Sequence, residues 1–477
     1  MADTKKVLLH VDDVKMHFPL KKTSFFQKER PYIKAVDGVS IDIYEGETFG
    51  LVGESGCGKS TLGRILLQLY HQTAGSVRYS GITLNDYAPK YSLKDVSKIP
   101  SISGTPQEIA ESFPRQARIA GGLLLSSDLH GLTQALRENL LAVRQVNVLQ
   151  TLLQLHEIKR DALLSSENLS SSEKRKLDKL NGKIEHLNTD LEKAAIERDE
   201  CDAALQKMRE TCLDKPGYDI LEGARDVSID LKRLSKEEMR RQRRHLQVIF
   251  QDPYSSLNAR FSVGQIISEA LVAHNMYGRG TRQLEEYTLD IMDKCGLQKY
   301  FLHRYPHQFS GGQRQRIGIA RALATKPRFV VCDEAVSALD VSIQSQIINL
   351  LMDLKESSNL TYLFISHDLS TVKFISDRVA VMYLGNIVEL GDSDRIFAEP
   401  LHPYTNVLLE AIPTTDDESR KELQVIEGDI PSPINPPPGC KFHTRCKYAT
   451  DLCKTEIPEW RELRPRHWVA CHYPIGS

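Results

Sequence analysis

No stretch of this 477-residue chain approaches the roughly 20 consecutive apolar residues that a membrane-spanning helix requires. The segment Met1 to Lys6 also lacks the apolar region of a secretory signal, so we expect the chain to stay in the cytosol. Neither sign of charge is in excess, because 62 Lys and Arg residues are balanced by 63 Asp and Glu residues. The net charge of −1 argues against a protein that coats nucleic acid.

The rest of the composition describes a soluble globular protein. Hydrophobic residues make up 41% of the chain and charged residues 26%, which leaves ample material for a core. At roughly 100–200 residues per domain, the length suggests about three folding units. Structural disulfides are disfavoured in the cytosol, so the nine cysteines should be core residues, reactive thiols or metal ligands.

A phosphate-binding loop follows a predicted buried strand over 48–52. A helical pattern begins just after it, with apolar residues at Leu62, Ile65, Leu66 and Leu69. The intervening residues match G-x-x-x-x-G-K-[ST], whose backbone N–H groups and helix N-terminus attract phosphate. The predicted ATP-binding positions of this loop are Gly53, Ser55, Gly56, Cys57, Gly58, Lys59, Ser60 and Thr61. Lys59 should reach the β- and γ-phosphates, Ser60 should ligate Mg²⁺, and Cys57 should serve packing and not chemistry.

Two further constellations lie downstream. The apolar run 329–332 predicts a buried strand that delivers Asp333 as a Mg²⁺-holding acid and Glu334 as a general base for water. Just upstream, Ser310-Gly-Gly opens a predicted helix over 317–324 and forms a second anion-binding arrangement. Two such loops about 250 residues apart fit an enzyme in which two subunits sandwich each nucleotide.

With these motifs in place, the chain resembles the ATP-binding subunit of an ABC transporter. The matching segments are Gly53–Thr61 (Walker A), Gln251 (Q-loop), Phe309–Gln313 (signature), Phe329–Glu334 (Walker B), Ser337–Asp340 (D-loop) and His367 (switch histidine). Phe309 stands where Leu is commoner, and Ala335 stands where Pro usually follows the Walker B glutamate. The resemblance implies an α/β fold with a RecA-like core, an antiparallel β-subdomain and a helical subdomain.

The resemblance also implies roles for single residues. Gln251 would bind Mg²⁺ with Ser60 and Asp333, and would assist catalysis with Glu334 and His367. The signature and D-loop residues would act on the nucleotide of a partner subunit: Ser310, Gly311, Gly312, Gln313 and Asp340. An aromatic residue before the first core strand stacks on adenine in this family. Phe18 is our candidate, with Phe25, Phe26 and Tyr32 as alternatives.

Four stretches resemble the oligopeptide/dipeptide importer branch more narrowly, at 56–64, 249–258, 336–344 and 400–405. They look like the second, "F"-type ATPase of that branch. This resemblance implies a heterodimer with a second ATPase, two transmembrane permease subunits and an extracytoplasmic solute-binding protein. The chain would lie at the cytoplasmic face of the membrane as a peripheral subunit, without a nucleic-acid partner. The alternatives are an ATPase component of a phosphonate-metabolism complex and a non-transport ABC protein.

Cysteines recur near the C-terminus, after a proline-rich linker over 431–439. Cys440, Cys446, Cys453 and Cys471 lack the C-x2-4-C knuckles of structural zinc sites. Four thiolates at loop spacing suit a [4Fe–4S] cluster, which the resemblance to the C-terminal extension of this branch also implies. Zinc and four free thiols remain alternatives. A structural staple is favoured over redox sensing.

A long insertion separates the first hairpin from the Q-loop. Its second half carries an apolar heptad seam broken only by Arg198: Leu177, Leu180, Ile184, Leu187, Leu191, Ala194, Cys201, Leu205, Met208 and Cys212. An earlier segment is also amphipathic, with Leu125, Leu129, Leu132, Leu136, Leu140 and Val143 on one face. Together they predict an antiparallel coiled-coil hairpin with arms of roughly 50 Å. It is either a tolerated surface insertion or a docking arm.

The predicted domain order follows from these segments. Residues 1–88 form the first part of the ATPase domain, 89–225 the inserted hairpin, 226–412 the second part of the ATPase domain, and 413–477 the cysteine-rich extension.

Overall fold

The computed structural model describes residues 5–21, 30–164, 170–411 and 428–476, and the chain folds into two compact units. Unit 1 takes its described residues from Met1–Val77, Arg243–Ile267 and Leu289–Ser477. Unit 2 comprises Arg78–Gln242 and Ser268–Thr288. The insertion and its flanking residues therefore fold as a body of their own, while the domain boundaries given above stay a prediction.

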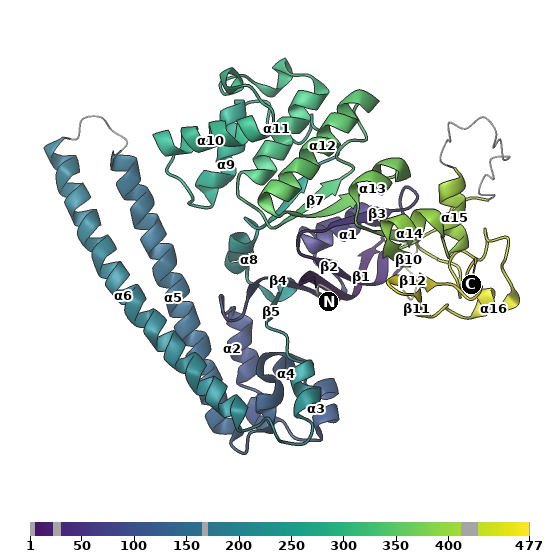
Figure 1. Ribbon diagram of the computed structural model, residues 1–477, viewed down its shortest axis with the longest axis horizontal. Helices are drawn as coiled ribbons and strands as arrows, with labels where there is room; N and C mark the ends of the chain where they lie inside the picture. The colour runs from purple at the N-terminus through teal and green to yellow at the C-terminus, as the bar shows by residue number, and fades with distance from the viewer. Residues whose placement is uncertain (1–4, 22–29, 165–169, 412–427, 477) are drawn as a thin grey trace. The chain divides into compact units, whose positions relative to one another are not determined.

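Unit 1 is built on an eight-stranded sheet with the strand order β11-β12-β10-β9-β3-β8-β7-β6 (Figure 1). The strands are β3 (Thr48–Val52), β6 (Leu246–Ile249), β7 (Phe329–Asp333), β8 (Thr361–Ile365), β9 (Arg378–Tyr383), β10 (Asn386–Asp392), β11 (Trp460–Arg464) and β12 (His467–Ala470). The five strands from β9 to β6 run parallel, and every residue of β3, β7 and β8 is buried. Such continuous apolar strands are typical of a sheet covered on both faces. The predicted α/β core and the predicted strand over 48–52 are confirmed.

Seven α-helices lie wholly within unit 1 among the described residues. They are α1 (Lys59–Leu66), α11 (Gly311–Leu323), α12 (Val341–Ser358), α13 (Leu369–Ile375), α14 (Ser393–Ala398), α15 (Pro403–Glu410) and α16 (Asp451–Thr455). Helix α1 packs against β7 and β8, and α13 against β3. Helix α1 ends earlier than its apolar pattern predicts, because Gln68 adopts a left-handed backbone with φ 52°. Placing Leu69 on the helix face was wrong, since Leu69 is 46% exposed.

Two antiparallel strand pairs complete the β-structure. In unit 1, β1 (Val7–Pro19) pairs with β2 (Tyr32–Tyr44). In unit 2, the distal part of β4 (Ala74–Thr83) pairs with β5 (Ser228–Asp230), with Tyr79 opposite Ile229. The chain leaves β4 and returns to β5 alongside it, so the insertion occupies the position of a hairpin loop.

The C-terminal segment joins the main sheet. Strand β12 pairs with β10, with Leu390 opposite Trp468, and β11 forms the edge. The residues after the masked segment 412–427 therefore belong to unit 1 and are not a separate body.

Unit 2 is mostly helical. Its elements are α2 (Lys90–Val96), η1 (Ile99–Ser101), α3 (Pro106–Ser112), α4 (Pro114–Ala120), η2 (Gly121–Leu125), α5 (Leu129–Leu164), α6 (Ser171–Glu210), α7 (Tyr218–Gly223), η3 (Leu231–Arg233) and α8 (Lys236–Gln242). Helices α9 (Val263–Ala273) and α10 (Arg282–Lys294) each contribute part of their length. Helices α5 and α6 have 36 and 40 residues, about 54 and 60 Å at 1.5 Å per residue.

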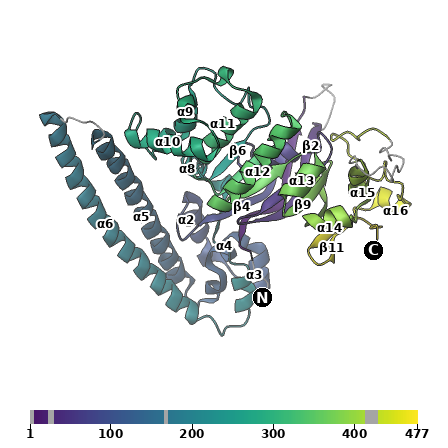
Figure 2. The same cartoon turned by 45° about the horizontal axis from the view of Figure 1, so that its top comes forward.

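The predicted helical hairpin is confirmed, because α5 and α6 run side by side and antiparallel in both views (Figures 1 and 2). Every α6 residue of the predicted seam is buried or half-buried, and most residues between them are exposed. Ser170 caps α6 in a capping box with Glu173, while 165–169 lie outside the described residues. Leu125 belongs to η2 and not to the long helix as predicted. A regular coiled coil along the pair stays a prediction.

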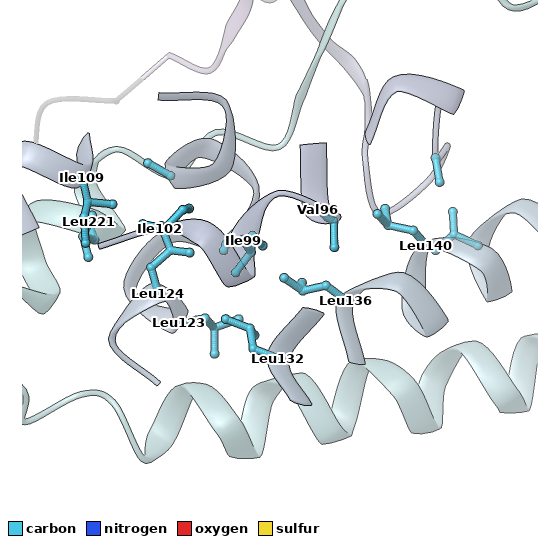
Figure 3. Close-up of a cluster of buried hydrophobic side chains, with 14 residues drawn as sticks. Val96, Ile99, Ile102, Ile109, Leu123, Leu124, Leu132, Leu136, Leu140 and Leu221 are labelled. Atoms are coloured by element: carbon cyan, nitrogen blue, oxygen red, sulfur yellow. The ribbon is translucent and has the colours of Figure 1, made fainter. Parts of the chain in front are cut away.

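The base of the hairpin has its own hydrophobic core. Short helices α2 to α4, η1, η2 and α7 pack with the first turns of α5 (Figure 3). Leu123 and Leu132 are fully buried in this core. Leu136 and Leu140 extend it along α5, and Leu221 closes it from α7. The insertion is thus more than a pair of helices, because a packed cluster anchors it.

None of the helices in the described ranges combines the length and the apolar character needed to cross a bilayer.

Candidate active site

The fold brings the sequence motifs to one edge of the main sheet. Parallel strands β3, β6, β7 and β8 all end at the same edge, where crevices in α/β folds bind ligands. The phosphate-binding loop follows β3, and Glu334 follows β7. Gln251 lies two residues beyond β6, and His367 two residues beyond β8.

The loop after β3 depends on glycines at Gly53 and Gly58. Both have positive φ angles, 147° and 110°. A Cβ on Gly53 would lie 2.2 Å from the carbonyl oxygen of Met382, and one on Gly58 would lie 2.0 Å from that of Ala35. Neither position accommodates another residue, because a backbone carbonyl cannot move aside as the end of a side chain can.

Lys59 is held inside this loop. Its Nζ donates to the carbonyl oxygens of Gly53 at 2.7 Å and Glu54 at 3.0 Å. Lys59 is only 5% exposed, whereas Ser55 and Gly56 at the loop tip are exposed. The ammonium therefore lies within the loop, and its contact with the phosphates stays a prediction.

Two other side chains, Cys57 and Thr61, are less exposed than the tip of the loop. Cys57 is 5% exposed, and burial raises the pKa of its thiol above the ordinary value. A thiol of this kind stays protonated, which agrees with a packing role. Thr61 is half-buried in the first turn of α1.

Two predicted Mg²⁺ ligands meet across the sheet. The hydroxyl of Ser60 donates to Oδ1 of Asp333 at 2.6 Å, although 273 positions separate the two residues. Asp333 ends β7 and is 8% exposed. A hydroxyl and a carboxylate in contact form an oxygen donor set that fits Mg²⁺.

Two predicted catalytic side chains, Gln251 and His367, converge on the carboxylate of the third, Glu334. Oε2 of Glu334 accepts a hydrogen bond from Nε2 of Gln251 at 2.7 Å and lies 3.4 Å from Nδ1 of His367. Glu334 has a left-handed backbone, with φ 50°, directly after β7. Residues held in this region cluster at functional sites, where neighbouring structure maintains the strain. An amide, an imidazole and a carboxylate in contact can position and deprotonate a water molecule.

The predicted signature lies at the start of α11. The hydroxyl of Ser310 accepts from the backbone N–H of Gln313, whose side chain in turn accepts from the N–H of Ser310. Gly312 packs against α12, because a Cβ there would lie 2.5 Å from Cγ2 of Ile343. Ser310 is exposed and Gly311 is half-buried.

The D-loop is exposed as well, with Asp340 at the N-cap of α12. In the part of the chain that the structure describes, no hydrogen bond joins Ser310 or Asp340 to the phosphate-binding loop or to Glu334.

The contacts of the candidate adenine-stacking residue, Phe18, do not distinguish a stacking role from a packing role. Phe18 lies near the end of β1, half-buried, with its ring edge-on to Tyr70 at 5.5 Å. Of the alternatives, Tyr32 is 44% exposed at the start of β2, and Phe25 and Phe26 lie outside the described residues. The stacking role stays a prediction.

The structure adds two contacts to the loop that sequence reasoning missed. The hydroxyl of Tyr404 accepts from the backbone N–H of Glu54 at 2.9 Å. The guanidinium of Arg445 donates to both carboxylate oxygens of Glu54, at 2.8 and 3.0 Å. In the sequence, the segment around Tyr404 indicates only the importer branch and no contact with the loop. No local pattern indicated Arg445.

The four C-terminal cysteines line one cavity together with His402 and His443. Burial, and to a lesser extent the neighbouring thiols, raises the pKa of Cys471 to about 12. Burial also raises the pKa values of Cys440 and Cys446. The structure thus gathers the four predicted ligands, in a setting that disfavours bare thiolates.

This cavity has one unpaired polar group among its described residues. His402 is 1% exposed, and its Nδ1 accepts from the N–H of Tyr404 at 3.0 Å. The neutral ring therefore carries its proton on Nε2, which is buried without a hydrogen-bond partner. Among the described residues, no group of three or more His, Cys, Asp or Glu side chains is placed to hold a metal ion.

Comparison with known protein families gives two matches, one to the ATPase domain and one to the C-terminal region. The ABC transporter family matches residues 36–181 and 221–337, and the oligopeptide/dipeptide transporter C-terminal region matches 388–453. The oligopeptide transport ATP-binding protein AppF of Bacillus subtilis is 35% identical over 474 residues, covering 99% of this chain and 98% of AppF.

Two further relatives give the same picture. The putative oligopeptide transport ATP-binding protein YkfD of B. subtilis is 36% identical over 468 residues, covering 98% of this chain and 95% of YkfD. A putative peptide import ATP-binding protein of Brucella ovis is 54% identical over 243 residues, covering 51% of this chain and 76% of that protein.

Proposed function

The chain belongs to the ABC transporter ATP-binding family, and we propose that it hydrolyses ATP to drive the import of peptides or a related small solute. The convergence of Gln251 and His367 on the Glu334 carboxylate carries the catalytic part of this proposal. The match of residues 388–453 to the oligopeptide/dipeptide C-terminal region, and the names of its relatives, support the transported class.

In the proposed reaction, the protein binds the phosphates and activates water. Lys59 neutralises charge on the β- and γ-phosphates, and Ser60, Asp333 and Gln251 would hold Mg²⁺, which polarises the transferred phosphoryl group. Glu334 accepts a proton from the attacking water. Gln251 and His367 orient that water and keep the carboxylate in place.

The proposed assembly contains a second ATPase. Ser310 and Asp340 are exposed and have no hydrogen bond to the phosphate-binding loop of their own chain among the described residues, which supports a role at a partner's nucleotide. We propose that closing and opening of the two ATPases drives two permease subunits, fed by a solute-binding protein. The chain would then be a peripheral protein at the cytoplasmic face of the membrane.

Glu334→Gln tests the catalytic proposal. This variant keeps the shape of the side chain but cannot accept the proton, so we expect ATP hydrolysis to fall by about 10²–10⁴-fold. ATP binding should stay near the wild-type level, because among the described residues the hydrogen bonds and ion pairs of Glu334 go to Gln251, Ser337, Ile365 and His367 and not to the phosphate-binding loop. Phosphate release measures the first quantity and a fluorescent ATP analogue the second. Hydrolysis at the wild-type rate by Glu334→Gln would contradict the assigned base.

The importer proposal needs a separate measurement. Uptake of a labelled dipeptide by cells that carry the wild-type chain should exceed uptake by cells that carry Glu334→Gln. Affinity purification from solubilised membranes should also recover permease subunits. Recovery of ribosomes or soluble phosphonate enzymes in their place would contradict import.

For the cysteine cavity, we propose a [4Fe–4S] cluster held by Cys440, Cys446, Cys453 and Cys471. The fit rests on two observations: all four thiols line one cavity, and the buried Nε2–H of His402 lacks a partner that a cluster sulfur would supply. A cluster spreads its four thiolates over four irons, so it does not require the tight grouping of a single-metal site. When bound, the cluster would cross-link the loops of the extension.

Iron and sulfide analysis of anaerobically purified protein tests this assignment. We expect about four irons per chain with a visible absorption band, and loss of both in Cys446→Ser. Cys201→Ser is the matched control, because Cys201 lies on α6 in the other unit. Colourless protein that contains one zinc per chain would contradict the cluster.

A further inference from the structure

Glu54, the second residue of the phosphate-binding loop, forms its ion pair with the C-terminal extension. Nη1 and Nη2 of Arg445 reach Oε2 and Oε1 of Glu54 at 2.8 and 3.0 Å, the two-pronged geometry of a strong guanidinium–carboxylate pair. The Arg445 side chain is 5% exposed and that of Glu54 is 19% exposed. Solvent therefore screens this pair much less than an ordinary surface ion pair.

The main chain of Glu54 is held from the same side. Its N–H donates to the hydroxyl of Tyr404, which is fully buried on α15. The Tyr404 ring packs against Tyr383 at 4.7 Å and against Phe442 of the extension at 5.3 Å. Tyr383 in turn lies 3.5 Å from Nη1 of Arg445, through its hydroxyl. Backbone and side chain of Glu54 are thus both fixed by residues beyond position 380.

The contact continues to the ATP-binding lysine. The carbonyl oxygen of Glu54 accepts from Nζ of Lys59 at 3.0 Å. Any rotation of Glu54 would therefore displace an acceptor of the group that meets the phosphates. In addition, the carboxylate of Glu54 places a negative charge beside a loop that binds a polyanion. Arg445 neutralises this charge where it stands.

We propose that Arg445 is a positioning residue for the ATP site, which holds the Glu54 carboxylate in its fork and cancels the repulsion of that carboxylate for ATP. This inference rests on the proposed function, because it assumes that the loop binds ATP. It assigns to the C-terminal extension a direct part in nucleotide binding. Through this ion pair, the ATPase domain and the C-terminal extension would act together in binding ATP.

Removing the guanidinium of Arg445 should weaken ATP binding, and removing the carboxylate of Glu54 as well should restore it. In Arg445→Met the Glu54 carboxylate is left unpaired beside the phosphates, so we expect the Kd and KM for ATP to rise about tenfold. The kcat at saturating ATP should change less than threefold, because Glu334 and its partners are untouched. In the double variant Glu54→Gln/Arg445→Met the repulsion is gone, and ATP affinity should return to within threefold of wild type.

The matched control is Arg466→Met. Arg466 also belongs to the extension and pairs with a carboxylate of the cassette, Asp392, at 2.8 Å, but Asp392 lies on β10 and not in the loop. Its ATP affinity should equal that of wild type. Arg445→Lys, which keeps the charge but not the fork, should lie between wild type and Arg445→Met.

Each outcome decides the matter. Equal ATP affinity of Arg445→Met and wild type contradicts the inference. A double variant no better than Arg445→Met also contradicts it, because a purely structural role is not repaired by removing the carboxylate. If Arg445→Met fails to fold, Glu54→Gln alone tests the inference. This variant removes the carboxylate that would repel ATP, so a more than threefold loss of ATP affinity would contradict the inference. Wild-type protein that does not bind ATP would instead contradict the proposed function.

Discussion

One residue with unusual backbone geometry, Glu334, lies at the edge of the main sheet where the sequence motifs meet. Glu334 adopts φ 50°, a conformation that costs of order 1–3 kcal/mol for a residue with a side chain. Its N–H donates to Ile365 at 3.0 Å, and its carbonyl oxygen accepts from the hydroxyl of Ser337 at 3.0 Å. These two bonds come from both sides of the residue and keep its carboxylate facing Gln251. The strain is therefore local, and it is offset by bonds that the neighbouring strand and the D-loop supply.

Replacing a glycine with alanine should change stability in opposite directions in two helices. A Cβ on Gly63, in α1, would lie 2.9 Å from Cγ1 of Val331 and 3.0 Å from Cδ1 of Ile365. Gly63→Ala should lower the free energy of unfolding by about 1–3 kcal/mol through overpacking. Gly182, in α6, has no atom within 4 Å of its added Cβ, so Gly182→Ala should raise local stability by about 0.5–1 kcal/mol.

For Gly63→Ala, unfolding in denaturant is measured by the appearance of tryptic fragments from unit 1. For Gly182→Ala, hydrogen exchange along α6 measures the change in local stability. Each variant serves as the control of the other, since the same methyl group is added to a helix in both. A shift of the same sign in both would contradict the packing argument.

At the scale of elements, the long hairpin depends on its base. Helix α5 buries Leu132, Leu136 and Leu140 in the cluster of short helices, while its distal half runs beside α6 and also has Gly278 near Ile158 and Ala162. Exposed residues are common on both helices away from the seam. The insertion therefore has a packed base, from which the two long helices extend.

Leu132→Ala should destabilise this base by about 2–5 kcal/mol, because Leu132 is fully buried and its loss leaves a cavity. Limited proteolysis and hydrogen exchange over 88–223 should show faster opening. Leu141→Ala is the matched control, since Leu141 lies on the same helix and is 45% exposed. ATP binding should be unchanged in both, and equal proteolysis of the two variants would contradict the assignment of the core.

Sequence patterns predicted the elements whose signal is local. The strand over 48–52, the phosphate-binding loop and the α6 seam follow from residues within a few turns of one another. The short helices α3 and α4 were not predicted, because each has only seven residues and too few turns to show an apolar period, although Thr105 and Glu108 form a capping box at the start of α3.

The same limit applies to the site. The motifs named Ser60, Asp333 and Glu334, since each lies in a recognisable local pattern. The fork between Arg445 and Glu54 spans 391 positions, and neither residue has a neighbour that indicates the other. Tyr404 was visible only as part of a motif, without a role. Pairs of this kind are accessible only when the fold is known.

For the whole molecule, the position of the insertion makes it separable in principle. Strands β4 and β5 are adjacent and antiparallel, with Arg78 opposite Asp230, so the chain enters and leaves at one place. Replacing 84–227 with a short Asn-Gly turn should preserve the sheet and leave ATP binding within about twofold, because two-residue turns of this type join antiparallel strands.

Transport then shows what the insertion does. Unchanged dipeptide uptake by the shortened chain would indicate a tolerated insertion, and lost uptake with intact ATP binding would indicate a docking arm. Leu132→Ala in the full chain is the companion variant, because it loosens the base without removing the arm. Loss of ATP binding on excision would contradict the separability of the insertion.

The fork between Arg445 and Glu54 also has a consequence for protein synthesis. Ribosomes add about 5–20 residues per second, so roughly 20–80 s pass between the emergence of Glu54 and that of its partner 391 positions later. During this interval the nascent chain carries a phosphate-binding loop whose carboxylate is not neutralised. If Arg445 tunes the loop as proposed, tight nucleotide binding would begin only after Arg445 has emerged from the ribosome. On the same proposal, a ribosome that stalls before Arg445 would release an ATPase domain that binds ATP more weakly than the full chain.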